Sequence, residues 1–162
     1  MQSSNEDRLV VNGRFLRAPA TGLHRAGRSL LHAARNAGLE FDVFAPTGVD
    51  DPLVDRILPA PPGRGSDHLW EQFVLPLHAR GRRILSVANT APLACRRSVV
   101  WIHDLAPLVG PQWFSPTMQI YGRVALTAAR RAERVLTASE QVAGELRQRG
   151  VRSTVSVLRQ AV

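Results

Sequence analysis

The chain has 162 residues, of which 44% are hydrophobic, 21% are charged and 6% are aromatic. A chain of this size and composition is expected to fold as one globular domain, which excludes a disordered protein and a coiled coil. The formal net charge is +8, and the sequence contains no lysine. A GC-rich genome favours arginine whatever the protein does, whereas selection for a phosphate or lipid headgroup partner favours the bidentate grip of arginine on oxyanions.

The single cysteine, Cys95, cannot form an internal disulfide, and no Cys/His cluster has the spacing of a structural zinc site. The N-terminus lacks the basic start and apolar run of a signal peptide, and no apolar run reaches the roughly 18 residues of a membrane-spanning helix. We therefore expect a cytoplasmic protein without a metal site, in which any contact with an anionic membrane is peripheral, at the inner membrane face.

The first part of the chain alternates β-rich runs with a helical run, which is typical of a parallel sheet covered by helices. The pattern predicts a strand over residues 9–15, a loop over residues 17–22, and a helix that follows this loop and ends before Gly38. A second strand is expected over residues 41–45. The helix is expected to place its apolar residues at helical spacing, namely Leu23, Ala26, Leu30, Ala33 and Ala37.

Residues 46–65 are predicted to be irregular, because prolines and glycines crowd this segment. A helix is expected after it, and Pro76 should kink or end that helix. Trp70 is interpreted as a core residue, while the neighbouring Glu71 and Gln72 face either solvent or a crevice. The apolar side of this helix would consist of Leu69, Trp70, Phe73 and Leu77.

Ser115 is predicted to cap a long helix, because a proline at the first helical position follows it. The apolar face of this helix would carry Met118, Tyr121, Ala125, Ala128 and Ala132, and the opposite side Arg123, Thr127, Arg130 and Arg134. The arginine stripe is either a solvated face or a contact with an anionic membrane or an acidic partner. Further strands are expected over residues 84–87, 99–102, 135–138 and 154–158.

Three loops that follow strands carry the residues best suited to a binding site. Gly22 opens the helix after the first strand, His103 and Asp104 follow the fourth, and Ser139 and Glu140 follow the fifth. Ligands of open parallel sheets bind outside the carboxyl ends of the strands. These loops are therefore expected to meet in one crevice.

Each of these residues has a functional and a structural interpretation. Gly22 would let backbone N–H groups approach a phosphate or sugar closely, although its loop lacks the Gly-x-Gly-x-x-Gly spacing of dinucleotide-binding proteins. His103 could donate to a sugar hydroxyl while Asp104 orients it or accepts from an acceptor hydroxyl, or the pair only closes a turn. Ser139 can cap the next helix, and Asn89 either caps a following segment or reaches the ligand.

Five short segments form a pattern when they are taken together. They are Thr21-Gly22, Leu69-Trp70-Glu71-Gln72 with Leu75-Pro76 downstream, Asn89-Thr90-Ala91-Pro92-Leu93, Val100-Trp101-Ile102-His103-Asp104-Leu105, and Val135-Leu136-Thr137-Ala138-Ser139-Glu140. In this order they resemble the N-terminal domain of family 4 glycosyltransferases, a group that includes bacterial mannosyl- and rhamnosyltransferases. The pattern extends over nearly the whole chain, which makes the resemblance fairly specific for that domain.

The resemblance implies an α/β fold, with a Rossmann-like parallel sheet flanked by helices, that forms the N-terminal half of a GT-B fold. Residues 1–162 would be a single acceptor-side domain, and the C-terminal donor-binding domain would be missing. The implied reaction is transfer of a hexose from a nucleotide-sugar to a glycan or lipid-linked acceptor, in polysaccharide biosynthesis, without a metal or other cofactor. His103 and Asp104 would be catalytic, and Gly22, Ser139 and Glu140 would lie near the donor or acceptor in the cleft.

The chain ends soon after its last expected strand, which suggests that more protein followed, as a further domain or a separate subunit. Without a donor-binding domain we expect this chain alone to have negligible transferase activity. The alternative function is a non-catalytic module that binds a glycan or lipid, or docks on another transferase. A nucleic-acid partner is not expected, since no helix-turn-helix, zinc or aromatic-platform signature accompanies the arginines.

Overall fold

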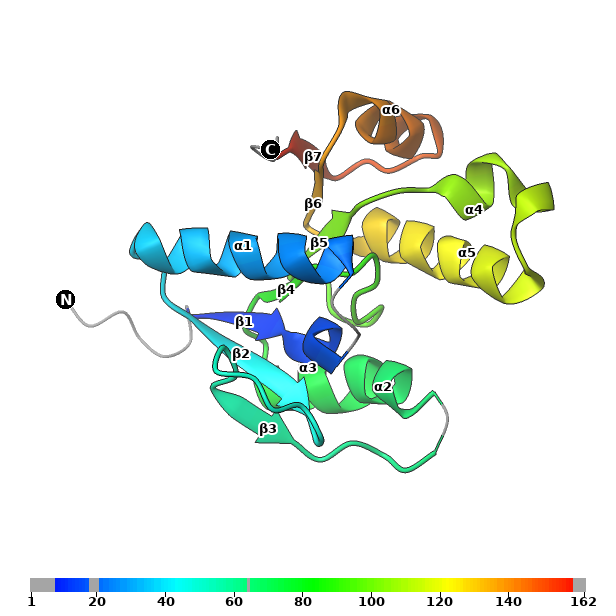
Figure 1. The fold of residues 1–162 in the computed structure, drawn as a ribbon. Coiled ribbons are helices and arrows are strands. Elements are labelled where there is room, and N and C mark those ends of the chain that lie inside the picture. The colour runs from blue at the N-terminus through cyan, green and yellow to red at the C-terminus, as the bar shows by residue number, and fades with distance from the viewer. Residues whose placement is uncertain (1–7, 18–20, 64, 159–162) are drawn as a thin grey trace.

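A computed structural model describes residues 8–17, 21–63 and 65–158. These residues form one seven-stranded sheet with the strand order β3-β2-β1-β4-β5-β6-β7, and all neighbouring strands are parallel (Figure 1). The fold is therefore α/β and Rossmann-like, which confirms the fold class expected from the alternation of strands and helices. The strands are β1 (Leu9–Asn12), β2 (Phe41–Pro46), β3 (Arg56–Leu58), β4 (Ile84–Ser86), β5 (Ser98–Ile102), β6 (Arg134–Thr137) and β7 (Thr154–Val157).

The longer helices begin at side chains that cap them, and two of these caps, Ser115 and Ser139, were expected from the sequence. Thr21, Ser115 and Ser139 each accept a hydrogen bond from the backbone N–H three residues further on. Among the helices within the described ranges, none is long and apolar enough to cross a membrane. The helices are α1 (Gly22–Asn36), α2 (Ser66–Leu69), α3 (Leu75–Ala79), α4 (Ala106–Val109), α5 (Pro116–Arg131) and α6 (Glu140–Gln148), with 3-10 turns at Gly13–Arg17 and Pro111–Trp113.

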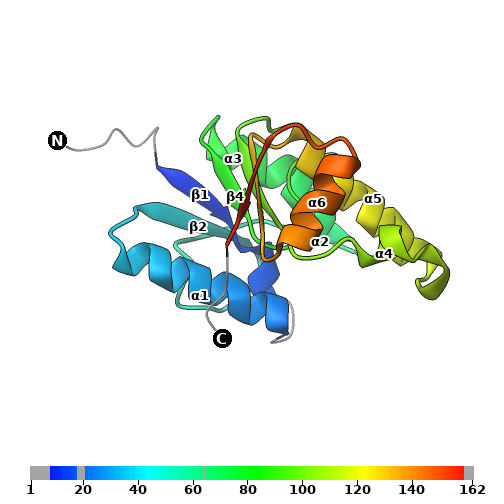
Figure 2. The same ribbon diagram turned by 90° about the horizontal axis from the view of Figure 1, so that it is seen from above.

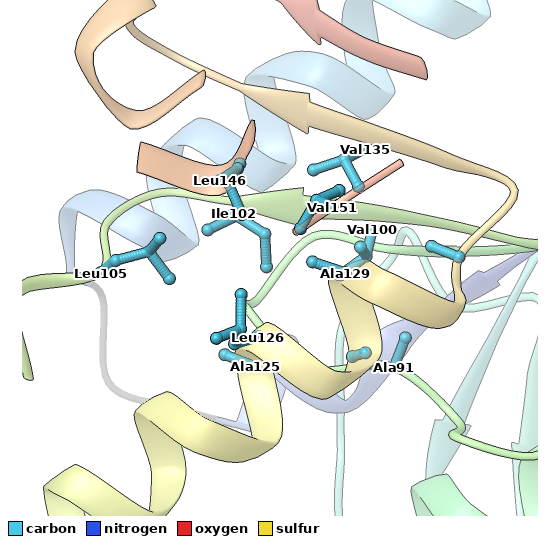
Figure 3. Close-up of a cluster of buried hydrophobic side chains, with 12 residues drawn as sticks. Ala91, Val100, Ile102, Leu105, Ala125, Leu126, Ala129, Val135, Leu146 and Val151 are labelled. Carbon is cyan, nitrogen blue, oxygen red and sulfur yellow. The ribbon is translucent and has the colours of Figure 1, made fainter. Parts of the chain in front are cut away.

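The two faces of the sheet are covered by different helices. In Figure 2, α1 lies on one side of the sheet, while α3 and α5 lie on the other. Neighbouring residues of β1 show the division: Val11 packs in the cluster that contains Leu31 of α1, and Val10 packs with Trp70. The largest cluster fills the space between β5, β6 and helices α5 and α6 (Figure 3).

The first strand is shorter than the predicted strand over residues 9–15. It ends at Asn12, and a 3-10 turn over Gly13–Arg17 replaces the expected end of the strand. A Cβ atom at position 13 would lie 2.7 Å from the carbonyl oxygen of Phe44, so glycine lets the turn approach β2 closely. The turn directs the chain across the carboxyl end of the sheet.

A short strand, β3, lies inside the segment that was expected to be irregular. It pairs with β2 through residues Arg56, Ile57 and Leu58, and it forms one edge of the sheet. Only three residues take part, so the strand is too short to show an alternating pattern of its own. Leu58 is buried while Arg56 and Ile57 are exposed, as an edge position allows.

The predicted apolar side of the helix around Trp70 is wrong. Trp70 is fully buried, but Leu69, Phe73 and Leu77 are 48%, 67% and 76% exposed. The reason is a π-helical turn, η2 (Trp70–Val74), between α2 and α3, closed by a hydrogen bond from the Leu75 N–H to the Trp70 carbonyl. The wider turn shifts the helical phase of the residues that follow Trp70, so Leu75 joins Trp70 in the interior while Phe73 and Leu77 face outward.

Two other helix faces differ from the simple periodic pattern. In α5, Ala125, Ala128 and Ala132 are buried as expected, but Met118 is 43% exposed. Arg134 lies in β6 rather than on the helix, because α5 ends at Arg131. In α1 the buried stripe follows Gly27 and Leu31, so the expected core residues Ala33 and Ala37 are exposed.

Candidate functional site

The strand order creates a switch point between β1 and β4. The chain moves from β1 outward through β2 and β3, then crosses back to β4 on the other side of β1. The connections that leave β1 and β4 therefore diverge, which opens a crevice at the carboxyl ends of these strands. Val11 pairs with Leu85, so Asn12 and Ser86 lie next to each other at this point.

A buried polar cluster occupies the switch point, and we call it the Glu71 network. Oε2 of Glu71 accepts hydrogen bonds from Asn12 Nδ2 at 2.8 Å, from Arg14 Nε at 3.0 Å and from Thr90 Oγ1 at 3.1 Å. Asn12 Nδ2 also lies 3.1 Å from Ser86 Oγ, and Arg14 donates to Thr90 Oγ1 at 2.7 Å. The network therefore joins β1, β4 and the helical segment that carries Glu71.

The network holds an ion pair almost out of contact with water. The side chain of Glu71 is 1% exposed and that of Arg14 is 13% exposed. Burial acts to lower the pKa of Arg14, but the Glu71 carboxylate and the Tyr121 hydroxyl raise it more, so the net shift is upward. The guanidinium is thus a fixed cation with a fixed orientation, which is the condition for a preorganised binding group.

A cavity of about 310 Å³ lies against the outer side of this network. Tyr121 crosses from α5 to close one wall, where its hydroxyl donates to the Ala88 carbonyl at 3.0 Å and its ring meets His68 edge-on. Arg17 forms an ion pair with Asp67 at the rim. The cavity is lined by Arg14, Phe15, Arg17, Thr21, Leu23, Asp67, Ala88 and Tyr121.

His103 lies at the end of β5 and is held from several directions. Its backbone N–H donates to Oδ1 of Asn89 at 2.7 Å, and its ring stacks on Trp101 with 4.6 Å between centroids. Asn89 adopts a positive φ of 61°, a conformation that asparagine tolerates better than most residues. The Asn89 side chain thus positions the His103 backbone, 14 residues away in the chain, which is neither of the two roles considered from the sequence.

The hydrogen bond of the His103 ring determines which nitrogen is available to a ligand. Nε2 lies 2.8 Å from the carbonyl oxygen of Val87, which can only accept, so Nε2 carries the proton. In the neutral ring, Nδ1 is then an acceptor. His103 would accept from a ligand hydroxyl through Nδ1, whereas the sequence suggested donation to a hydroxyl.

We expect the imidazole of His103 to titrate below the usual histidine value, because burial lowers its pKa more than the Val87 carbonyl and the Asp104 carboxylate raise it. Its contribution to folding stability is then present above about pH 6.5 and is lost as the pH falls through the lowered pKa. NMR titration of the His103 ring, assigned with a His103→Gln variant, measures this directly. A pKa at or above the usual value, or nitrogen shifts showing Nδ1–H, would contradict the assignment.

The other predicted site residues lie at the same edge of the sheet, since each follows the carboxyl end of a parallel strand. Gly22 begins α1 beside Thr21, and a Cβ there would meet nothing within 4 Å, so no protein atom requires glycine. Asp104 accepts from the Ala106 N–H at 3.1 Å, and Ser139 caps α6. Glu140 is exposed at the first position of α6.

None of the five predicted site residues lines this cavity. Thr21, the neighbour of Gly22, contributes to the lining, but Gly22 itself, His103, Asp104, Ser139 and Glu140 do not. Neighbouring parallel strands are about 4.8 Å apart, so the end of β6 is roughly 14 Å along the rim from that of β1. The site is therefore an extended rim with its cavity at the β1–β4 switch point.

Comparison with models of known protein families found none that matches this chain. Comparison with curated proteins also found no match. Within the described ranges, no group of three or more His, Cys, Asp and Glu side chains is arranged to hold a metal ion. The functional conclusion therefore rests on the geometry of the rim and on the motif pattern.

Most of the Glu71 network and the wall formed by Tyr121 were not predicted from the sequence. The sequence allows Glu71 to face either solvent or a crevice, and the structure shows it to be buried. Tyr121 was expected on the apolar face of α5. A buried tyrosine hydroxyl needs a hydrogen-bond partner, and this requirement could have indicated a polar contact at that position. The polar residues that end β1 and β4, Asn12 and Ser86, were the other signal, because buried polar side chains at strand ends require partners.

Proposed function

We propose that this chain is the acceptor-side domain of a glycosyltransferase of the family 4 type. It would help to transfer a hexose from a nucleotide-sugar to a glycan or lipid-linked acceptor. The observation that carries the proposal is the cavity at the β1–β4 switch point, whose wall contains Arg14 of the buried Glu71 network. This is the position at which doubly wound sheets bind their ligands.

The charge of the cavity supports the acceptor side rather than the donor side. Arg14 is paired with Glu71, and Arg17 is paired with Asp67, so the arginines that line the cavity are already neutralised. A donor diphosphate requires cations that are not already paired, whereas a neutral sugar requires matched donors and acceptors. The residual N–H groups of Arg14 and the Tyr121 hydroxyl suit the second requirement.

Glycosyl transfer develops positive charge on the sugar ring and negative charge on the departing diphosphate. The chain's contribution would be to orient the attacking hydroxyl, with Nδ1 of His103 as a candidate acceptor for its hydrogen bond. Asp104 lies beside His103 and favours a positive charge on its ring. The groups that stabilise the diphosphate would come from the donor-binding domain that the resemblance implies.

The direct test is NMR titration of the isotopically labelled chain with a panel of mono- and disaccharides and, separately, with UDP and GDP. We expect a saccharide to shift the backbone amides of Phe15, Ala88 and Tyr121, and the nucleotides to leave them unchanged. A Tyr121→Phe variant should weaken saccharide binding by roughly three- to tenfold, the value of one hydrogen bond.

The matched control is Thr127→Ala, which also removes a hydroxyl from α5 but one that donates within the helix, to the Arg123 carbonyl. It should leave binding unchanged. Stronger shifts at the cavity with UDP or GDP than with any saccharide would contradict an acceptor-side role. Saccharide binding that persists without transfer, once a donor-binding domain is supplied, would favour the non-catalytic glycan-binding module; rapid turnover by this chain alone would refute the proposed division of labour.

A further inference from the structure

A second cavity lies away from the rim that carries the candidate site. Its volume is about 400 Å³, and it is lined by Leu93, Ala94, Arg96, Arg130 and Arg131. Arg96 lies two residues before β5, and Arg130 and Arg131 end α5 just before β6. The arginines therefore gather near the amino ends of β5 and β6, at the edge opposite to the Glu71 network.

Two of the three guanidinium groups are held in place by the main chain. Arg130 donates from Nε to the carbonyl oxygen of Arg149 at 3.0 Å, and Arg131 donates from one terminal nitrogen to that of Leu93 at 3.2 Å. A guanidinium has five N–H donors, so each retains donors that these bonds do not use. Anchored donors lose less conformational entropy when a ligand binds.

The end of a helix explains part of this cluster but not all of it. The carbonyl end of α5 carries partial negative charge, which favours Arg130 and Arg131 there without any ligand. Arg96 comes from a different segment, is exposed, and makes no hydrogen bond or ion pair with the residues that the structure describes. Its position over the same cavity adds a cation that helix capping does not require.

The cavity also lacks an acidic lining residue among the described side chains. This distinguishes it from the cavity at the switch point, where the lining arginines are paired with carboxylates. Converging arginines without counter-charges match a ligand with several anionic oxygens, because the planar fork of arginine binds such groups bidentately.

We infer that the cavity of Arg96, Arg130 and Arg131 binds a phosphate-type oxyanion. The group could belong to a soluble phosphate ester or to a lipid headgroup, and the chemistry of recognition is the same. The site is separate from the proposed sugar cavity, so either can fail without the other.

The test measures binding by calorimetry at low ionic strength. Pyrophosphate is the soluble probe. The lipid probe is vesicles of phosphatidylcholine, either alone or mixed with phosphatidylglycerol. Arg96→Gln should weaken binding of the probe by about tenfold or more, the loss of one charge-assisted contact. Arg96→Lys should weaken binding less than Arg96→Gln, since lysine keeps the positive charge but lacks the planar guanidinium that binds two oxygens at once. Binding should weaken as salt is added.

The matched control is Arg25→Gln, which removes one exposed arginine from α1 on the other face of the sheet. Pyrophosphate binding that falls in Arg96→Gln and not in Arg25→Gln supports the inference and a soluble ligand. If only binding to anionic vesicles falls in Arg96→Gln and not in Arg25→Gln, the inference is supported with a lipid headgroup as the ligand. Equal losses in both variants, or no binding of either probe, overturn it, since the effect would then be net charge only or nothing at all.

Discussion

Glu71→Gln will lower the free energy of unfolding by about 3–5 kcal/mol, because it leaves the buried Arg14 guanidinium without its counter-charge. The carboxylate oxygen that it alters accepts from Asn12, Arg14 and Thr90 together. A glutamine oxygen could take the place of this oxygen, but it carries no full negative charge for the guanidinium, and the glutamine NH2 group would then face Nε2 of Gln72, which donates to the other carboxylate oxygen. Thermal or urea unfolding followed by circular dichroism measures the loss.

The control for this prediction is Glu133→Gln. Glu133 forms an ion pair with Arg83, but both side chains are more than 40% exposed, so the loss should be below about 1 kcal/mol. A double variant, Arg14→Met with Glu71→Leu, should recover part of the loss, since a buried ion pair can be replaced by apolar groups at little cost. If Glu71→Gln were as mild as Glu133→Gln, the buried network would not exist as described.

Trp70→Ala will destabilise the fold by about 3–5 kcal/mol, the usual cost of removing a large aromatic side chain from a core. Trp70 is fully buried and packs with Val10, Leu75 and Ile84 beneath the sheet. Because the described residues offer no partner to its Nε1, Trp70→Phe removes no hydrogen bond and should cost clearly less. Equilibrium unfolding in urea gives both values.

Phe73→Ala is the comparison that tests the π-helical turn. A regular helix through this segment would place Phe73 on the same apolar side as Trp70, but the structure leaves Phe73 67% exposed. The expected loss is therefore within about 0.5 kcal/mol, as for an ordinary surface position. A loss comparable to that of Trp70→Ala would show that the helix is regular and that the turn is misplaced.

The candidate site could be predicted from the sequence only in outline. The loops after β1, β5 and β6 were expected at one edge of the sheet, which follows from parallel strands alone. The separation of these loops along that edge depends on the strand order. The strand order also places the cavity between β1 and β4, where Tyr121 lies against Arg14. No local sequence pattern predicts that contact.

What the amino-acid sequence by itself determined is the local structure: the alternation of strands and helices and the helix starts at Ser115 and Ser139. These features depend on side chains and backbone groups within a few residues of one another. The α/β class follows from their alternation.

Only the tertiary structure decided the chemistry of the switch point. Glu71 binds Asn12 across 59 positions of the chain, and Asn12 binds Ser86 across 74. Such contacts depend on strand order and register, and on where the helical segment that carries Glu71 packs against the sheet. Periodicity along the chain carries no information about any of these, since they arise when distant segments pack together.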